Sequence, residues 1–137
     1  MKKFLRREEG FTLIELLVVV AVLGILAALA IPRLTGVTEK ARLAEAEQAI
    51  GSLKTAAEMY FVENNTYEGL DEDAIKEYID WDSLPANWTY SIEDVSKETF
   101  TIKAEGKAGT ANANLGAKIN EKNEIYTTRD TTNDTNW

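Results

Sequence analysis

The 137-residue chain contains no cysteine and no histidine. Without cysteine it cannot form a disulfide, present a thiolate nucleophile or build a zinc–thiolate site. Without histidine it lacks the base of a serine–histidine–aspartate triad and the commonest ligand of transition metals. Its carboxylates and lysines are residue types that usually form a solvated surface. We therefore expect no enzymatic activity, no cofactor and no metal ion.

Positive charge is also scarce, because 15 Lys and Arg stand against 23 Asp and Glu, which gives a net charge of −8. Residues 1–10 hold four of the basic residues and two Glu, so the remainder carries a net charge of −10. Affinity for nucleic acids comes largely from neutralisation of phosphates by Lys and Arg. We therefore expect no direct binding of nucleic acid.

One long stretch of the chain is almost free of polar residues. From Phe11 to Ile31 it reads FTLIELLVVVAVLGILAALAI, with Glu15 as its only charge. About twenty apolar residues match the span that a helix needs to cross a hydrocarbon core. The basic residues just before this stretch are expected to stay in the cytoplasm. The sequence therefore predicts a single-pass membrane protein with its N-terminus inside and its C-terminus outside.

An ordinary secretory signal is the alternative, because Ala28-Leu29-Ala30 looks like a small-residue cleavage site after an apolar stretch. The apolar stretch is, however, longer than the roughly 7–15 residues of such signals. It also holds a carboxylate, for which a mere targeting segment has no use.

The string Gly10-Phe11-Thr12-Leu13-Ile14-Glu15, after a short basic leader and before an aliphatic block, resembles the class III signal of type IV prepilins. The resemblance covers roughly residues 1–63. It implies that a prepilin peptidase cuts after Gly10, removes residues 1–10 and methylates the new amino terminus at Phe11, while the apolar helix is kept. It also implies an inner-membrane platform protein, a cytoplasmic assembly ATPase and other copies of this chain as partners in a helical homopolymer.

Beyond Pro32 an amphipathic helical pattern resumes, with apolar residues three and four apart. These residues are Leu43, Ala46, Ile50, Leu53, Ala57 and Tyr60. We expect a near-continuous helix from Phe11 to about Val62, divided into a hydrophobic assembly segment, 11–38, and an amphipathic segment, 39–63. Pro32 and Gly24 weaken this helix, so a kink is expected. The resemblance further implies that Gly24 to Pro32 unwinds in the filament.

The remaining residues predict a small sheet, and the fold class is α+β: one long N-terminal helix whose second half packs on an antiparallel sheet, as in type IV pilins. Residues 64–87 are expected to form a connecting loop with a short helix over Glu72–Ile79, capped by Asp71. The acids of this loop fit no calcium-binding motif. A polar tail, 129–137, is expected to be loose, with Trp137 as its only possible anchor.

The sheet itself is expected within residues 88–128, where apolar and polar residues alternate. Trp88 to Ile92 and Phe100 to Ala104 should pair as a hairpin around Ser96-Lys97. Leu115–Ile119 and Glu124–Thr127 should form a second pair, joined by the turn Asn120–Asn123. The apolar face of this sheet should cover Ile50, Leu53, Ala57 and Tyr60.

Glu15 lies about one helical turn from the new amino terminus at Phe11. A charge buried in a filament needs a partner, because an unpaired buried charge costs several kcal/mol. The resemblance implies that the amine of Phe11 from a neighbouring subunit supplies this partner and fixes the register of assembly. The alternative is that Glu15 pairs with the amine of its own chain.

The resemblance implies that this chain is the major subunit of a type IV pilus. Such a pilus is an extracellular filament that serves adhesion, motility or DNA uptake. A pseudopilin of a type II secretion system is the closest alternative, because pseudopilins have the same kind of N-terminal segment as residues 1–63 of this chain. A membrane-anchored binding or enzymatic domain is a third class. Such a domain should carry a pocket with convergent polar groups, and nothing in the sequence points to one.

We predict that the mature protein begins at Phe11 with a methylated amino group, because the Gly10–Phe11 junction stands at the edge of the span, where a membrane peptidase can reach it. Intact-mass analysis of protein purified from its own cells checks this. A product that begins at Ile31 would instead identify an ordinary secretory signal.

Overall fold

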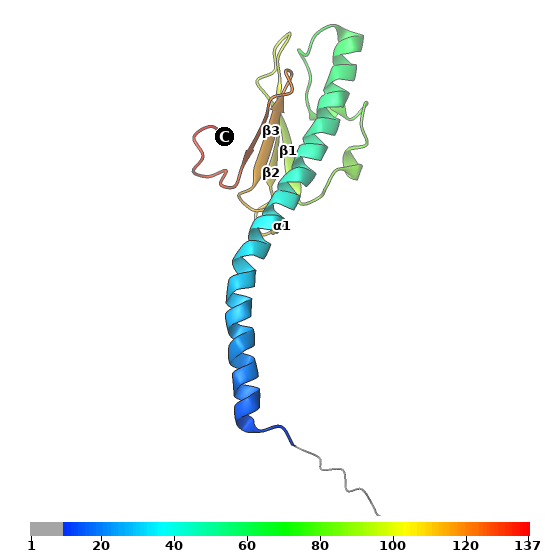
Figure 1. The fold of residues 1–137 in the computed structure, drawn as a ribbon. Helices are drawn as coiled ribbons and strands as arrows, with labels where there is room; N and C mark the ends of the chain where they lie inside the picture. The colour runs from blue at the N-terminus through cyan, green and yellow to red at the C-terminus, as the bar shows by residue number, and fades with distance from the viewer. Residues whose placement is uncertain (1–9) are drawn as a thin grey trace, which may run out of the picture. The chain divides into compact units, whose positions relative to one another are not determined.

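The computed structural model describes residues 10–137, apart from the side chains of Arg33 and Leu34. Most of the predicted leader therefore lies outside the described residues. The chain divides into two compact units, Met1–Val37 and Thr38–Trp137. Helix α1, Leu13–Asn64, includes the boundary between them (Figure 1). This helix agrees with the predicted range to within two residues at each end.

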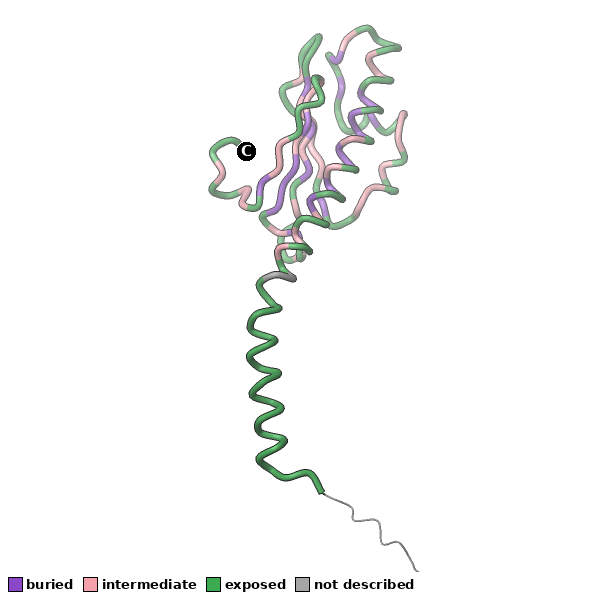
Figure 2. Tube along the Cα trace, in the orientation of Figure 1, coloured by how far each residue is buried: buried purple, intermediate pink, exposed green. Residues whose placement is uncertain are grey.

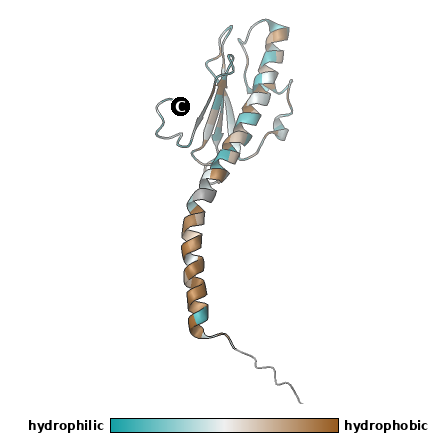
Figure 3. Ribbon diagram, viewed as in Figure 1, coloured by the Kyte–Doolittle hydropathy of each residue, from teal (hydrophilic) through white to brown (hydrophobic). Residues whose placement is uncertain are grey.

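In the first unit, the described side chains from Phe11 to Pro32 are all exposed (Figure 2). They are also almost entirely apolar, as the brown half of the ribbon in Figure 3 shows. By length and composition alone, α1 contains a segment that could cross a membrane, and no part of that segment is buried. A helix in the core of a soluble protein would be mostly buried. The apolar surface of this unit therefore has no partner within the described chain.

The second unit contains a four-stranded antiparallel sheet in which strands adjacent in sequence are adjacent in space. The strands are β1 (Trp88–Glu93), β2 (Thr101–Gly106), β3 (Gly116–Asn120) and β4 (Ile125–Thr128). Both predicted hairpins are confirmed; β2, β3 and β4 each begin one residue later than expected. Asp94 and Asn123 adopt left-handed backbone angles in the two hairpin connections, a conformation that Asp and Asn tolerate better than most residues.

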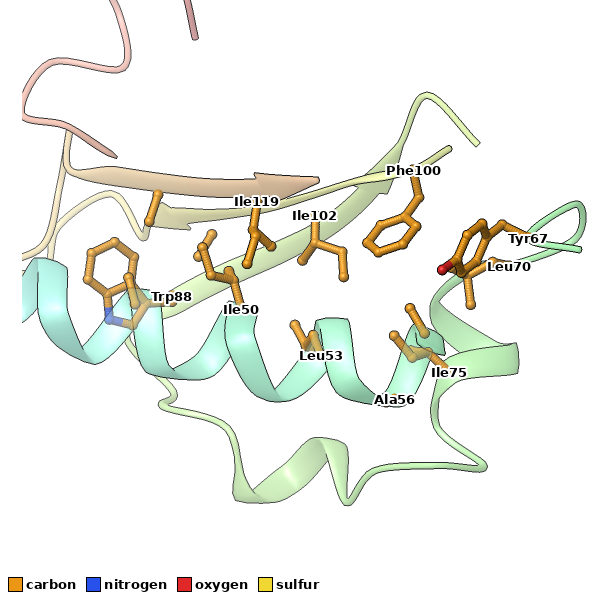
Figure 4. Packing of buried hydrophobic residues seen from close by; sticks show 14 of the residues in the cluster. Ile50, Leu53, Ala56, Tyr67, Leu70, Ile75, Trp88, Phe100, Ile102 and Ile119 are labelled. Atoms are coloured by element: carbon orange, nitrogen blue, oxygen red, sulfur yellow. The ribbon is translucent and has the colours of Figure 1, made fainter. Parts of the chain in front are cut away.

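The core of the second unit lies between this sheet and the second half of α1 (Figure 4). Ile50, Leu53 and Ala57 are fully buried, as predicted, and Ile102 and Ile119 cover them from the sheet. Tyr60, the last residue of the predicted row, is only half-buried. Its hydroxyl donates to the carbonyl of Glu68, 3.0 Å away, in the connecting loop. The apolar residues that the helical spacing predicts therefore form the buried face of the helix. The last of them, Tyr60, contacts the connecting loop.

The connecting loop contains α2 (Glu72–Ile75) and a short 3-10 helix, η1 (Trp81–Ser83). Asp71 caps α2 as predicted, with its carboxylate accepting from the amide of Ala74 at 2.8 Å. The helix is shorter than the predicted Glu72–Ile79, because the amides of Glu77 and Tyr78 bond to carbonyls three residues back. That is the pattern of a turn.

The C-terminal segment is attached to the sheet, and Trp137, which the sequence analysis named as its possible anchor, makes one of the contacts. Residues 129–137, called the strap below, lie on the side of the sheet opposite α1 (Figure 1). The amide of Thr131 donates to the carbonyl of Asn114 at 2.9 Å, and the indole of Trp137 lies directly against Gly116 of β3. Contacts with residues distant in sequence therefore order a segment whose composition alone indicated a loose one.

We predict that a fragment beginning at Glu39 is a soluble monomer, because among the described residues only Met59, Val62 and Ile125 of its large apolar side chains are exposed. Light scattering after gel filtration and circular dichroism check its mass and its strand content. The matched control is a fragment that begins at Phe11, which should aggregate without detergent. Aggregation of the shorter fragment would contradict the proposed division of the chain.

Candidate assembly site

The first turn of α1 is closed by a reciprocal pair, Thr12 and Glu15. The amide and the hydroxyl of Thr12 donate to Oε2 of Glu15 at 2.9 and 2.8 Å. In return the amide of Glu15 donates to the hydroxyl of Thr12 at 3.3 Å. This arrangement is a capping box, which satisfies amide groups that a helix N-terminus leaves without partners. The sequence analysis missed the role of Thr12, although the Thr-x-x-Glu spacing is the known signal for such a cap.

The cap occupies only one oxygen of the Glu15 carboxylate. Both donors of Thr12 bond to Oε2, and in the described part of the chain Oε1 has no hydrogen-bond partner. A carboxylate can accept several hydrogen bonds through its two oxygens. The carboxylate is therefore held in a defined orientation by its own chain, with one oxygen still open to a donor from outside.

Gly10 and Phe11, the two residues of the predicted processing site, lie just before the helix. Both are exposed, and the backbone from Gly10 to Thr12 has no regular secondary structure. Apart from its neighbours in the chain, no atom of the described residues lies within 4 Å of the position that a Cβ on Gly10 would take. The peptide bond between them is thus open to an approaching enzyme, while Glu15 is placed one turn away by the cap. Cleavage and methylation at this bond stay predictions.

Gly24 and Pro32, the predicted weak points, are both inside the continuous helix. Pro32 has no N–H to offer the carbonyl of Ala28, so one helical hydrogen bond is absent there. Three residues on, the hydroxyl of Thr35 donates to the carbonyl of Pro32 at 3.0 Å. Back-bonding of this kind often bends a helix. The single chain shows no break at Gly24–Pro32, and the unwinding expected in a filament stays a prediction.

The apolar segment of α1 carries a shallow depression of about 440 Å³ on one of its faces. It is lined by Leu13, Leu16, Leu17, Val20 and Ala21. Side chains three and four apart form such ridges and hollows on a helix, and the ridges of a second helix fit into them. This surface suits packing against another helix or against lipid.

A second hollow, of about 410 Å³, lies on the outer face of the sheet, which is the face opposite the second half of α1. It is lined by Lys103, Lys118, Tyr126 and Trp137, among others. Three of its charged side chains have partners: Lys103 pairs with Glu93, Lys118 donates to the carbonyl of Asn136, and Glu124 accepts from Asn120. The ammonium of Lys103 lies 2.9 Å from Glu93, and this hydrogen bond lowers the pKa of the Glu93 carboxyl. Among the described residues, no three acids are placed to hold a metal ion. The lysines that line this hollow are therefore already engaged by neighbouring groups.

Two families match adjoining parts of the chain. The family described as the prokaryotic N-terminal methylation motif matches residues 5–31, and the family described as type IV minor pilin ComP, DNA uptake sequence receptor, matches residues 32–117. The second match covers more than half of the chain and includes the second half of α1 and most of the sheet.

Individual proteins show the same similarity. The type IV wide pilus major component PilA4 of Thermus thermophilus is 35% identical over 106 residues, which cover 77% of this chain and 79% of that protein. The type II secretion system core protein G of Aeromonas hydrophila is 47% identical over 70 residues, about half of each chain at 48% and 49%. The crystal structure of the minor pilin PilV of Neisseria meningitidis shares the fold, with a TM-score of 0.57, 17% identity, and coverage of 71% of this chain and 92% of that one.

We predict that Thr12→Val weakens the cap, because valine keeps the shape and the backbone donor but loses the hydroxyl. Loss of a capping residue costs about 1 kcal/mol, which is roughly a fivefold faster amide exchange at Glu15. Hydrogen exchange of the full chain in detergent micelles measures this, with Thr12→Ser as the control that should behave as the wild type. Equal exchange in Thr12→Val and the wild type would show that the hydroxyl contributes nothing.

Proposed function

Because this chain belongs to the type IV pilin and pseudopilin family, we propose that it is the major structural subunit of a type IV pilus. In this role it polymerises through α1 into an extracellular filament that serves adhesion, motility or DNA uptake. The proposal is supported by the similarity to PilA4, a major pilus component, which extends over 77% of this chain. The subunit would be a building block with no catalytic role of its own.

The bare apolar surface of the first unit is compatible with polymerisation. Fifteen large apolar side chains between Phe11 and Val37 are exposed. In water this surface would cost about 25 cal/mol for each square ångström, so it has to be covered both before and after assembly. Before assembly the bilayer covers this surface, and in the filament equivalent helices of other copies take its place.

Glu15 sets the register of this assembly. Apolar contacts are non-directional, so they fix the axial position of one helix against another only weakly. The open oxygen of Glu15 can accept from the free amine of Phe11 on a neighbouring copy, once the leader has been removed. That pairing would remove two unpaired charges from an apolar filament core, where each costs several kcal/mol. The cap by Thr12 is compatible with this pairing, because it uses the other oxygen.

We propose the remaining partners of this chain from its membership of the family. A prepilin peptidase and methyltransferase would process Gly10–Phe11 on the cytoplasmic side, and a platform protein with a cytoplasmic ATPase would extract the subunit from the membrane. The N-terminus would lie inside and the C-terminal unit outside. Gly24 to Pro32 would unwind when the helix leaves the bilayer, at the point where Pro32 already removes a hydrogen bond.

Two related roles compete with the proposed one. The type II secretion proteins G are pseudopilins in the same family, and the chain spans about half the length of the first of these relatives. A minor pilin is the second alternative, because the family that matches residues 32–117 is described from a minor pilin. ComP is described as a receptor for DNA, but from Thr38 to Trp137 this chain has twenty Asp and Glu against ten Lys and Arg. We propose that it does not bind DNA directly, since DNA would be repelled.

We predict that cells with this chain as their sole pilin carry long filaments, labelled along their whole length by antibodies against the sheet. Immunogold electron microscopy checks this. Sparse labelling would indicate a minor pilin, and an absence of long filaments would indicate a pseudopilin.

In the same cells Glu15→Val should insert and be cleaved normally but assemble no filaments, because the apolar residue removes the paired charge. Glu15→Gln is the matched variant, since glutamine can still accept from Thr12 in a capping box but carries no charge. It should also fail to assemble. Normal filament yield from Glu15→Gln would show that the cap alone is sufficient and would overturn the role of the charge.

A further inference from the structure

The strap, residues 129–137, contacts the second unit at four places. Arg129 forms an ion pair with Glu39 of α1, 3.6 Å away. The other three contacts attach the strap to the outer face of the sheet. The amide of Thr131 donates to the carbonyl of Asn114, before β3. The hydroxyl of Tyr126, on β4, donates to the carboxylate of Asp134. This bond lowers the pKa of Asp134 and raises that of Tyr126. The third contact is the indole of Trp137, which lies across β2 and β3.

The indole of Trp137 packs directly against the backbone of Gly116. Gly116 is buried, although in β3 it shares the outward-facing side with Lys118, two residues on. A Cβ added to Gly116 would lie 2.7 Å from a methyl carbon of Thr131 and still closer to two ring carbons of Trp137. Contacts this short do not occur between real atoms, and the obstacle is a rigid ring. Any side chain at position 116 would therefore displace the indole.

Two lysines and one glutamate contact the indole of Trp137. Lys103 and Lys118 are direct partners across β2 and β3, a placement of like charges that destabilises a sheet on its own. Their ammonium groups lie 5.5 and 6.0 Å from the centre of the Trp137 ring, within the range of a cation–π interaction. The indole N–H donates to the carboxylate of Glu105, and Lys118 also donates to the carbonyl of Asn136.

We propose that Gly116, Glu105, Lys103 and Lys118 form a binding socket for an indole, and that Trp137 occupies it to close the strap on the sheet. The socket matches each part of its ligand. The bare backbone of Gly116 receives the ring, the carboxylate of Glu105 accepts from the ring N–H, and the two ammonium groups interact with the π-system. A chain with no cysteine has no covalent means of closing this segment. The closure is reversible, and an emptied socket binds free indole.

The first experiment measures closure in the full chain in detergent micelles. The endoprotease Asp-N cuts before Asp130 and Asp134, both inside the strap, and mass spectrometry follows the release of the C-terminal fragments. We expect cleavage at least tenfold faster in Trp137→Gly and in Gly116→Ala than in the wild type. Gly51→Ala is the matched control, because a Cβ at Gly51 meets no atom within 4 Å, and its strap should be cut at the wild-type rate. Cleavage of Gly116→Ala at the wild-type rate would overturn the proposal.

The second experiment measures the ligand directly, and it does not depend on whether Gly116→Ala folds. In the spectrum of ¹⁵N-labelled Trp137→Gly, free indole should shift the amide signal of Gly116 in a saturable manner. The same titration should leave that signal unchanged in the wild type, whose socket is occupied. The absence of a saturable shift in Trp137→Gly would show that the site does not recognise indole and that Trp137 merely rests on the sheet.

Discussion

The whole arrangement depends on an apolar surface that its own chain does not cover. From Phe11 to Pro32 the described side chains of α1 are exposed, and nearly all of them are hydrocarbon. Such a surface is stable only in a bilayer or against other apolar helices. The second unit differs, because the sheet and the connecting loop cover the apolar row on the later part of α1. One helix thus contains two kinds of surface, and the boundary between the compact units lies where one gives way to the other.

A single carboxylate in such a surface requires a specific explanation. Glu15 satisfies the first turn of its own helix through Thr12, as a cap does in a soluble protein. The same cap restricts the side chain to one orientation, which lowers the entropy that a second bond would have to overcome. The pairing proposed between subunits would therefore use a carboxylate that its own helix has already oriented.

Features with a regular period could be predicted from the sequence, and features that depend on particular distant contacts could not. The spacing of Leu43, Ile50 and Leu53 identified the buried face of α1, and the alternation around Trp88 and Ile102 identified the strands. The cap at Thr12 could have been found, because its signal is local, but the string that contains it was interpreted as a signal for processing and assembly. The position of Trp137 could not have been found. It depends on the absence of a side chain at Gly116, twenty-one residues earlier, and neither residue has a periodic pattern.

A closure made by an aromatic ring rather than by sulfur changes what the protein needs from its surroundings. Formation of a disulfide requires an electron acceptor, and its persistence depends on the redox potential of the surroundings. The proposed indole closure depends on neither, because it consists only of non-covalent contacts with β2 and β3. A second unit closed in this way would need no oxidation chemistry and would stay closed in reducing and oxidising surroundings alike.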